Sequence, residues 1–123
     1  MEFKYSPEIQ YEINHLLETI KIYKNLFSMN IEYYIDGWAI FLKEKKIYPR
    51  SIVIFKSYHK NSFSIKSFEI KLYDYKKEEY KELYSIKNLE NSDQLIKELK
   101  EIIYGKDIME YTSKKYFDKI NKD

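Results

Sequence analysis

Two histidines are the only imidazole side chains in this chain of 123 residues, so they are the first candidates for metal binding or proton transfer. Glu12 and His15 have the Glu-x-x-His spacing that supplies half of a carboxylate-bridged dimetal site on a helix. Such a site needs a second copy of the motif, and His59 has a lysine at the position of the glutamate. We therefore expect no metal site, with His15 on the flank of a helix and His59 in a turn.

Other groups with catalytic chemistry are scarce. The chain has no cysteine, which excludes a disulfide framework, a thiolate zinc site and a cysteine nucleophile. Gly37 and Gly105 are the only glycines, so there is neither a phosphate-binding loop nor a dinucleotide-binding fingerprint. No serine lies in a nucleophile elbow, and the 20 acidic residues form no distinctive pair. We expect a protein that is not an enzyme and binds no cofactor.

Charge is distributed unevenly along the chain. Residues 43–77 hold ten basic residues against three acids, a net charge of +7, whereas residues 1–42 (three against six) and 78–123 (nine against eleven) are acidic. Tyrosines lie between these lysines, a combination that suits either base stacking with phosphate contact or a protein interface. From this stretch we predict the following partner-binding residues: Lys46, Arg50, Lys56, Tyr58, Lys71, Tyr73 and Tyr75.

The first element predicted by the sequence is a long helix. Ser6, Pro7 and Glu8 provide an N-cap, a proline at the first helical position and an acidic first turn. Apolar residues then recur every three or four positions from Ile9 to Phe27, which places them on one helical face. We expect this helix to end near residues 28–30.

Strands are predicted in the middle of the chain. Apolar runs at 31–35 and 38–42 flank Asp36-Gly37, which favours a hairpin, and the alternative is one long strand bulged at the glycine. Further strands are expected at 51–58 and 63–75. The alternation within 63–75 slips near Ser67, which predicts a bulge there. We expect the following two sets on opposite faces: Phe68, Ile70 and Leu72 toward the core, and Glu69, Lys71, Tyr73 and Tyr75 on the open face.

The last third of the chain is predicted to contain a strand and two helices. Residues 76–90 suit either a helix or a strand, and we predict a fifth strand. Asn91 and Gln94 form a capping box for the next helix, Gly105 ends it, and Asp107 caps a final helix. The whole chain, 1–123, is expected to form one α+β domain: a long N-terminal helix, a four- to five-stranded antiparallel sheet and two C-terminal helices packed on the sheet.

Composition points to the kind of genome that encodes the chain. It contains 21 lysines but a single arginine, and 18 isoleucines but a single valine. Codon choice in an AT-rich genome explains these ratios better than side-chain chemistry does. An AT-rich source indicates a low-GC bacterium, or a phage or plasmid that it carries.

These features favour a small non-enzymatic protein-binding module that acts in the cytoplasm through one face of its sheet. An inhibitor of a host defence system, of the anti-CRISPR type and encoded by a phage or plasmid, suits this size and composition. The alternatives are a nucleic-acid-binding module that uses the same basic, tyrosine-bearing face and a toxin-neutralising immunity protein. The apolar runs are too short for a membrane span, and no secretory signal is visible. Self-association through a sheet edge is a further form of partner binding.

Overall fold

The computed structural model describes residues 7–73 and 77–120, with side chains described for 7–70 and 78–115. Its helices and strands follow the predicted order. In sequence they are α1 (Pro7–Ile20), the short 3-10 helix η1 (Lys21–Tyr23), β1 (Phe27–Tyr34), β2 (Gly37–Glu44), β3 (Arg50–Ser57), β4 (Ser62–Tyr73), β5 (Lys77–Leu89), α2 (Ser92–Ile103) and α3 (Lys106–Ile120). The α+β architecture is therefore confirmed, including the fifth strand.

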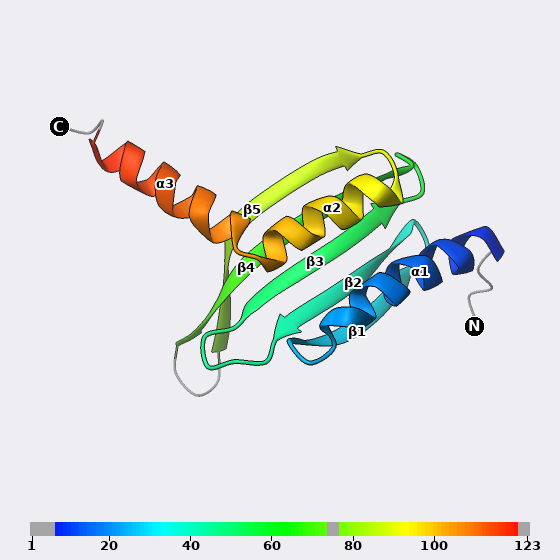
Figure 1. The fold of residues 1–123 in the computed structure, drawn as a ribbon, viewed down its shortest axis with the longest axis horizontal. Coiled ribbons are helices and arrows are strands. Elements are labelled where there is room, and N and C mark those ends of the chain that lie inside the picture. The colour runs from blue at the N-terminus through cyan, green and yellow to red at the C-terminus, as the bar shows by residue number, and fades with distance from the viewer. Residues whose placement is uncertain (1–6, 74–76, 121–123) are drawn as a thin grey trace.

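The five strands form one antiparallel sheet in the order β1-β2-β3-β4-β5, so each strand pairs only with its neighbours in the sequence (Figure 1). One row of isoleucines crosses the entire sheet in register: Ile31, Ile40, Ile54, Ile65 and Ile86. Residues directly opposite each other point to the same face, so this row gives that face an apolar centre. The helices α1 and α2 lie across the same side of the sheet in Figure 1.

The core lies between these two helices and the isoleucine row. α1 contributes Ile13 and Leu16, and α2 contributes Leu95 and Leu99, all of which are buried. Their spacings of three and four residues place each pair on one side of its helix. Trp38 and Phe63 extend the core toward one end of the sheet, with ring centroids 6.0 Å apart. α3 packs on β5 and α2 and then runs away from the other helices (Figure 1).

The first helix is shorter than the spacing of its apolar residues predicts. α1 ends at Ile20 and tightens into η1, and β1 begins at Phe27, so the predicted end at 28–30 is wrong. Phe27 continues the helical spacing in the sequence, yet it is a buried strand residue. Phe27 fits the helical spacing because the tight turn after α1 returns the chain to the core that α1 also packs against. Pro7 and Glu8 open the helix as predicted, and the proposed cap Ser6 lies outside the described residues.

The hairpin at Asp36-Gly37 is confirmed, since Tyr34 pairs with Gly37 in the β1–β2 register. A register shift at Ser67 and Phe68 is also confirmed, but β4 is not the bulged strand. Ser67 pairs with Tyr84 and Phe68 pairs with Glu82, which leaves Leu83 of β5 as the extra residue. At this shift the extra residue therefore belongs to β5 and not to β4.

The ends of α2 match the predicted signals. The Asn91 side chain accepts a hydrogen bond of 2.9 Å from the backbone N–H of Gln94, and the Gln94 side chain accepts one from the Glu90 N–H. Gly105 follows the helix with φ of +100°, a conformation that favours glycine. Asp107, however, is not a cap: it lies within the first turn of α3 and is fully buried. Its burial reflects an ion pair with Arg50, which the local sequence does not reveal.

Candidate protein-interaction site

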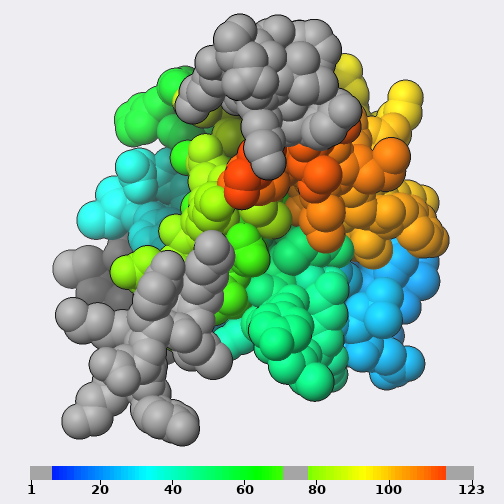
Figure 2. Space-filling model, turned by 90° about the vertical axis from the view of Figure 1, so that its left-hand side faces the viewer, coloured from blue at the N-terminus to red at the C-terminus, as the bar shows by residue number. Residues whose placement is uncertain are grey.

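The side of the sheet opposite α1 and α2 carries a second set of apolar side chains. We define the open face by the residues that line its shallow depression of about 440 Å³: Phe41, Ser51, Val53, Phe55, Lys66, Phe68 and Tyr80. In Figure 2, a side view of the molecule, blue and orange helical residues lie on the right while cyan and green strand residues lie on the left. Figure 1 places α1 and α2 on the other side of the sheet, and within the described residues no helix contributes to the lining of this face.

The open face is built from the alternate positions of β2 to β5. Phe41 pairs with Val53, and Val53 pairs with Lys66, so these side chains adjoin across three strands. The rings of Phe68 and Tyr80 meet edge to face, with centroids 6.4 Å apart and an interplanar angle of 88°. Such geometry adds about 0.5–1.5 kcal/mol to area burial. The four apolar members are only partly buried, and Tyr80 is 56% exposed.

The charged side chains around the open face neutralise each other. Lys43 Nζ lies 3.5 Å from Glu78, and Lys66 Nζ lies 3.6 Å from Glu82. The Tyr80 hydroxyl donates a 2.8 Å hydrogen bond to Glu78. This hydrogen bond, together with partial burial, raises the pKa of Tyr80 above its ordinary value, so the phenol is neutral at physiological pH. An apolar aromatic centre with a paired ionic rim is the usual anatomy of a protein interface.

Two of the predicted partner-binding residues are committed to internal contacts on the helix-covered side. Lys56 Nζ lies 2.7 Å from Glu12 of α1 and 4.7 Å from the ring centre of Phe63. Arg50 is 6% exposed and is bonded to Glu44 and Asp107. Neither cation lies on the open face.

The remaining predicted residues do not gather into one described surface. Tyr58 is partly buried and packs against the core, while Lys46 lies in the β2–β3 loop, 3.4 Å from Glu44. Lys71 and Tyr73 lie in β4, but their side chains are outside the described set, and Tyr75 lies wholly outside the described residues. Partner binding by all seven predicted residues stays a prediction.

The predicted assignment of faces in β4 is wrong for Phe68 and Glu69, whereas Ile70 is buried and the side chains at 71–73 lie outside the described set. Phe68 lies on the open face, whereas Glu69 pairs with Arg50, whose side chain is directed to the helix side. The error arises because the change in the spacing of apolar residues along β4 was read as a bulge in β4 itself. The bulge is in β5, at Leu83, and β4 carries apolar residues on both of its faces.

A signal for the open face was present in the sequence. β2 reads Trp-Ala-Ile-Phe-Leu at 38–42, and β3 reads Ile-Val-Ile-Phe at 52–55. An antiparallel strand with one solvated face alternates apolar and polar residues, whereas unbroken apolar runs are typical of strands covered on both sides. Sequence reasoning used these runs to locate strands and missed Phe41, Val53 and Phe55 as surface residues.

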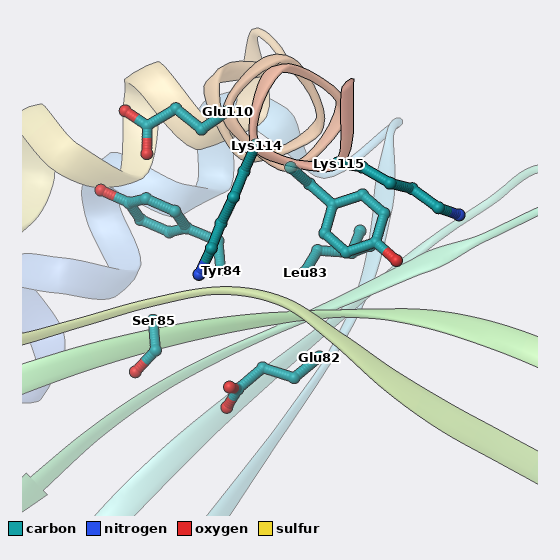
Figure 3. A pocket seen from close by; sticks show the side chains of 8 residues that line it. Glu82, Leu83, Tyr84, Ser85, Glu110, Lys114 and Lys115 are labelled. Carbon is teal, nitrogen blue, oxygen red and sulfur yellow. The ribbon is translucent and has the colours of Figure 1, made fainter. Parts of the chain in front are cut away.

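The second candidate is a cleft of about 510 Å³ between β5 and α3. Figure 3 shows Glu110, Lys114 and Lys115 of α3 facing Glu82, Leu83, Tyr84 and Ser85 of β5. The Tyr84 hydroxyl donates a 2.6 Å hydrogen bond to Glu98, which also accepts one of 2.9 Å from Lys106.

Burial and the hydrogen bond to Glu98 raise the pKa of Tyr84 to about 12, so this phenol is protonated at neutral pH and is no general base. The hydrogen bonds to Glu98 and Glu101 likewise raise the pKa of Lys106. These groups satisfy one another and join α2, α3 and β5. We regard the cleft as a structural contact between layers rather than a reactive site.

Metal binding finds no support in the part of the chain described with side chains, 7–70 and 78–115. There, no three Asp, Glu or His residues lie close enough together to hold an ion. Glu12, the carboxylate of the Glu-x-x-His pattern, is instead paired with Lys56. No described helix is long and apolar enough to cross a membrane.

Comparison with known proteins adds no assignment. The sequence matches no protein-family model, and the searches of curated proteins and of solved structures return no match. The case for function therefore rests on the chain's own residues and geometry.

Proposed function

We propose that this protein is a non-enzymatic protein-binding module that engages its partner through the open face. One observation carries the proposal. The central segments of β2 (38–42) and β3 (52–55) are apolar at both alternating sets of positions, while α1 and α2 cover only one of the two faces. A partner that covers the other face completes the burial for which these strands are composed.

The energetics of the open face suit a protein partner. Burial of apolar surface is worth about 25 cal/mol per Å², and aromatic residues are enriched at interface centres. Phe41, Phe55 and Phe68 are already held by their strands, so little conformational entropy is lost when they are covered. A standard interface buries about 800 Å² on each partner, and a five-stranded sheet face provides a surface of that order.

Nucleic-acid binding receives less support from the same surface. Phosphate recognition needs cations that are available to the ligand. Lys66 on the open face and Lys43 beside it are each paired with a glutamate, and Arg50 is buried in an internal network. An anti-CRISPR-type inhibitor and a toxin-neutralising immunity protein both belong to the protein-binding class that we propose, and the identity of the captured partner distinguishes them.

The test is affinity capture of the tagged protein from the lysate of an AT-rich bacterium, with and without nuclease, followed by mass spectrometry. Three chains are compared: the wild type, an open-face variant (Phe41→Ser with Tyr80→Ser) and a control variant (Tyr11→Ser with Tyr104→Ser). Tyr11 and Tyr104 are 76% and 79% exposed and lie on α1 and at the end of α2, away from the open face. Circular dichroism confirms that each variant is folded.

We expect the wild type and the control to retain the same nuclease-resistant protein and the open-face variant to lose it. A titration with the purified partner then confirms direct binding, with an affinity loss of at least about 10-fold in the open-face variant. Equal binding by the open-face variant contradicts the proposal. Capture that disappears with nuclease supports the nucleic-acid alternative. A third variant, Lys71→Glu with Tyr73→Ala, tests the residues predicted from sequence alone.

A further inference from the structure

β1 is an edge strand whose geometry fixes which backbone groups face outward. It pairs with β2 on one side, and the described sheet has no strand on its other side. Only two residues separate Tyr34 from Gly37, so these two form the hydrogen-bonded pair next to the turn. Hydrogen-bonded and non-hydrogen-bonded pairs then alternate along the ladder. The N–H and C=O groups of Met29 and Ile31 therefore point away from β2.

The two edges of the sheet differ in protection. Edge strands are normally guarded by lysine, proline, bulges or a covering element. β5 carries charged residues at six of its 13 positions, contains both register shifts and packs against α3. β1 has eight residues, and Glu32 is its only charged residue; it has no lysine, no proline and no register shift. Within the residues that the structure describes, β1 is thus the edge that is open to strand addition.

We propose that a second copy of this chain pairs antiparallel with β1, with the two-fold axis at Asn30. This register places Met29 opposite Ile31 of the second copy and Ser28 opposite Glu32, so side chains of one face meet and no like charges are opposed. The two Met29–Ile31 pairs alone supply about four backbone hydrogen bonds. The inference is independent of the proposed function of the open face.

Apolar surface beside β1 supports pairing with a second copy. Met29 is 49% exposed on the helix side and lines a depression of about 220 Å³ together with Leu17, Phe27 and Leu42. In the proposed register, Ile31 of the second copy lies directly against Met29 and covers part of this depression. A strand that carried charged residues at these positions would place no apolar side chain against Met29. The two sheets become one continuous sheet, with both open faces on the same side.

The absence of cysteine provides a direct test of the register. Asn30 is exposed and meets its own copy in a non-hydrogen-bonded pair, where Cα atoms are about 4.5 Å apart and within disulfide range. We expect Asn30→Cys to form a covalent dimer under mild oxidation. Glu79→Cys, at an exposed position on the β5 edge, is the matched control and should stay mainly monomeric. Equal cross-linking of the two variants overturns the proposal.

Sedimentation of the wild type gives the second measurement. We expect a dimer at about 100 µM and dissociation on dilution. Met29→Pro removes an outward N–H without breaking the β2 ladder, and it should shift the protein to monomer. A wild type that is monomeric at that concentration overturns the proposal, as does a folded Met29→Pro protein that remains dimeric. If Met29→Pro does not fold, the comparison of cross-linking in Asn30→Cys and Glu79→Cys tests the proposal instead.

Discussion

Arg50 and Asp107 lie 57 residues apart in the sequence and form a buried ion pair, with Nη1 of Arg50 2.7 Å from Oδ1 of Asp107. The same Nη1 donates a 2.8 Å hydrogen bond to the carbonyl oxygen of Ile102, at the end of α2. Nε donates another of 2.8 Å to Glu44. The only arginine of the chain thus joins the start of β3 to the junction of α2 and α3.

Glu44 shows the effect of this network on a carboxyl group. Burial raises the pKa of Glu44, but the hydrogen bonds and the charge of Arg50 outweigh burial and lower it overall. The carboxylate is therefore the stable form of Glu44 in the folded protein. Arginine suits this position because its planar guanidinium carries five donors on three separate nitrogens, whereas a lysine has three donors on a single nitrogen.

Arg50→Met should destabilise the fold strongly, since it leaves Asp107 buried without its cation. Breaking a buried pair from one side costs about 3–5 kcal/mol, whereas replacing both partners by apolar residues costs much less. We expect the double variant Arg50→Met with Asp107→Leu to recover most of the lost free energy of unfolding. Urea unfolding of the wild type, both single variants and the double variant measures the coupling. Additive losses would show that the two residues are not coupled.

Tyr84 should make stability fall at alkaline pH. Its pKa is raised from 10.0 to about 12, first by burial and then by the hydrogen bond to Glu98. The resulting stabilisation is fully present below pH 10, the ordinary value, and is lost as the pH rises toward 12. Tyr84→Phe should reduce this alkaline slope. Unfolding midpoints in urea between neutral pH and pH 11 provide the comparison, and identical slopes would contradict the assignment.

Gly37 and Gly105 should respond differently to the same substitutions. A Cβ at Gly37 would lie 2.0 Å from the backbone oxygen of Lys56, whereas a Cβ at Gly105 meets nothing within 4 Å. Gly37→Ala should therefore cost about 1–3 kcal/mol through overpacking, and Gly105→Ala should cost about 1–2 kcal/mol through left-handed strain.

Asparagine separates the two causes because it tolerates positive φ better than alanine does. We expect Gly105→Asn to be more stable than Gly105→Ala, and Gly37→Asn to be no more stable than Gly37→Ala. Thermal unfolding of the four variants measures this. An equal gain from asparagine at both positions would rule out the steric explanation for Gly37.

Elements defined by adjacent residues could be predicted from the sequence. The Asn91–Gln94 cap, the stop at Gly105 and the turn at Asp36 each depend on a few consecutive positions, and all are confirmed. The end of α1 could not be predicted, because Phe27 continues the helical spacing from within a strand. Local patterns specify which elements form but not where one periodicity gives way to another.

Long-range pairing limits what the sequence reveals about the candidate site. The faces of β4 depend on where the β4–β5 register shifts, and the extra residue, Leu83, belongs to the partner strand. Lys56 was expected to bind a partner because of its charge and its neighbours in the sequence. Its contact with Glu12 spans 44 residues and depends on how α1 crosses the sheet. For Lys56, charge counted along the chain therefore did not reveal that the cation is paired inside the fold.

The division of the sheet into two faces also has an evolutionary consequence. The isoleucine row and the helix residues that pack on it hold the fold together from one side only. Substitutions among the side chains on the other side leave that packing intact, so they are separated from the contacts that hold the fold. If the open face binds a partner as we propose, a lineage that inherits this scaffold can alter its binding specificity while the architecture beneath it stays the same.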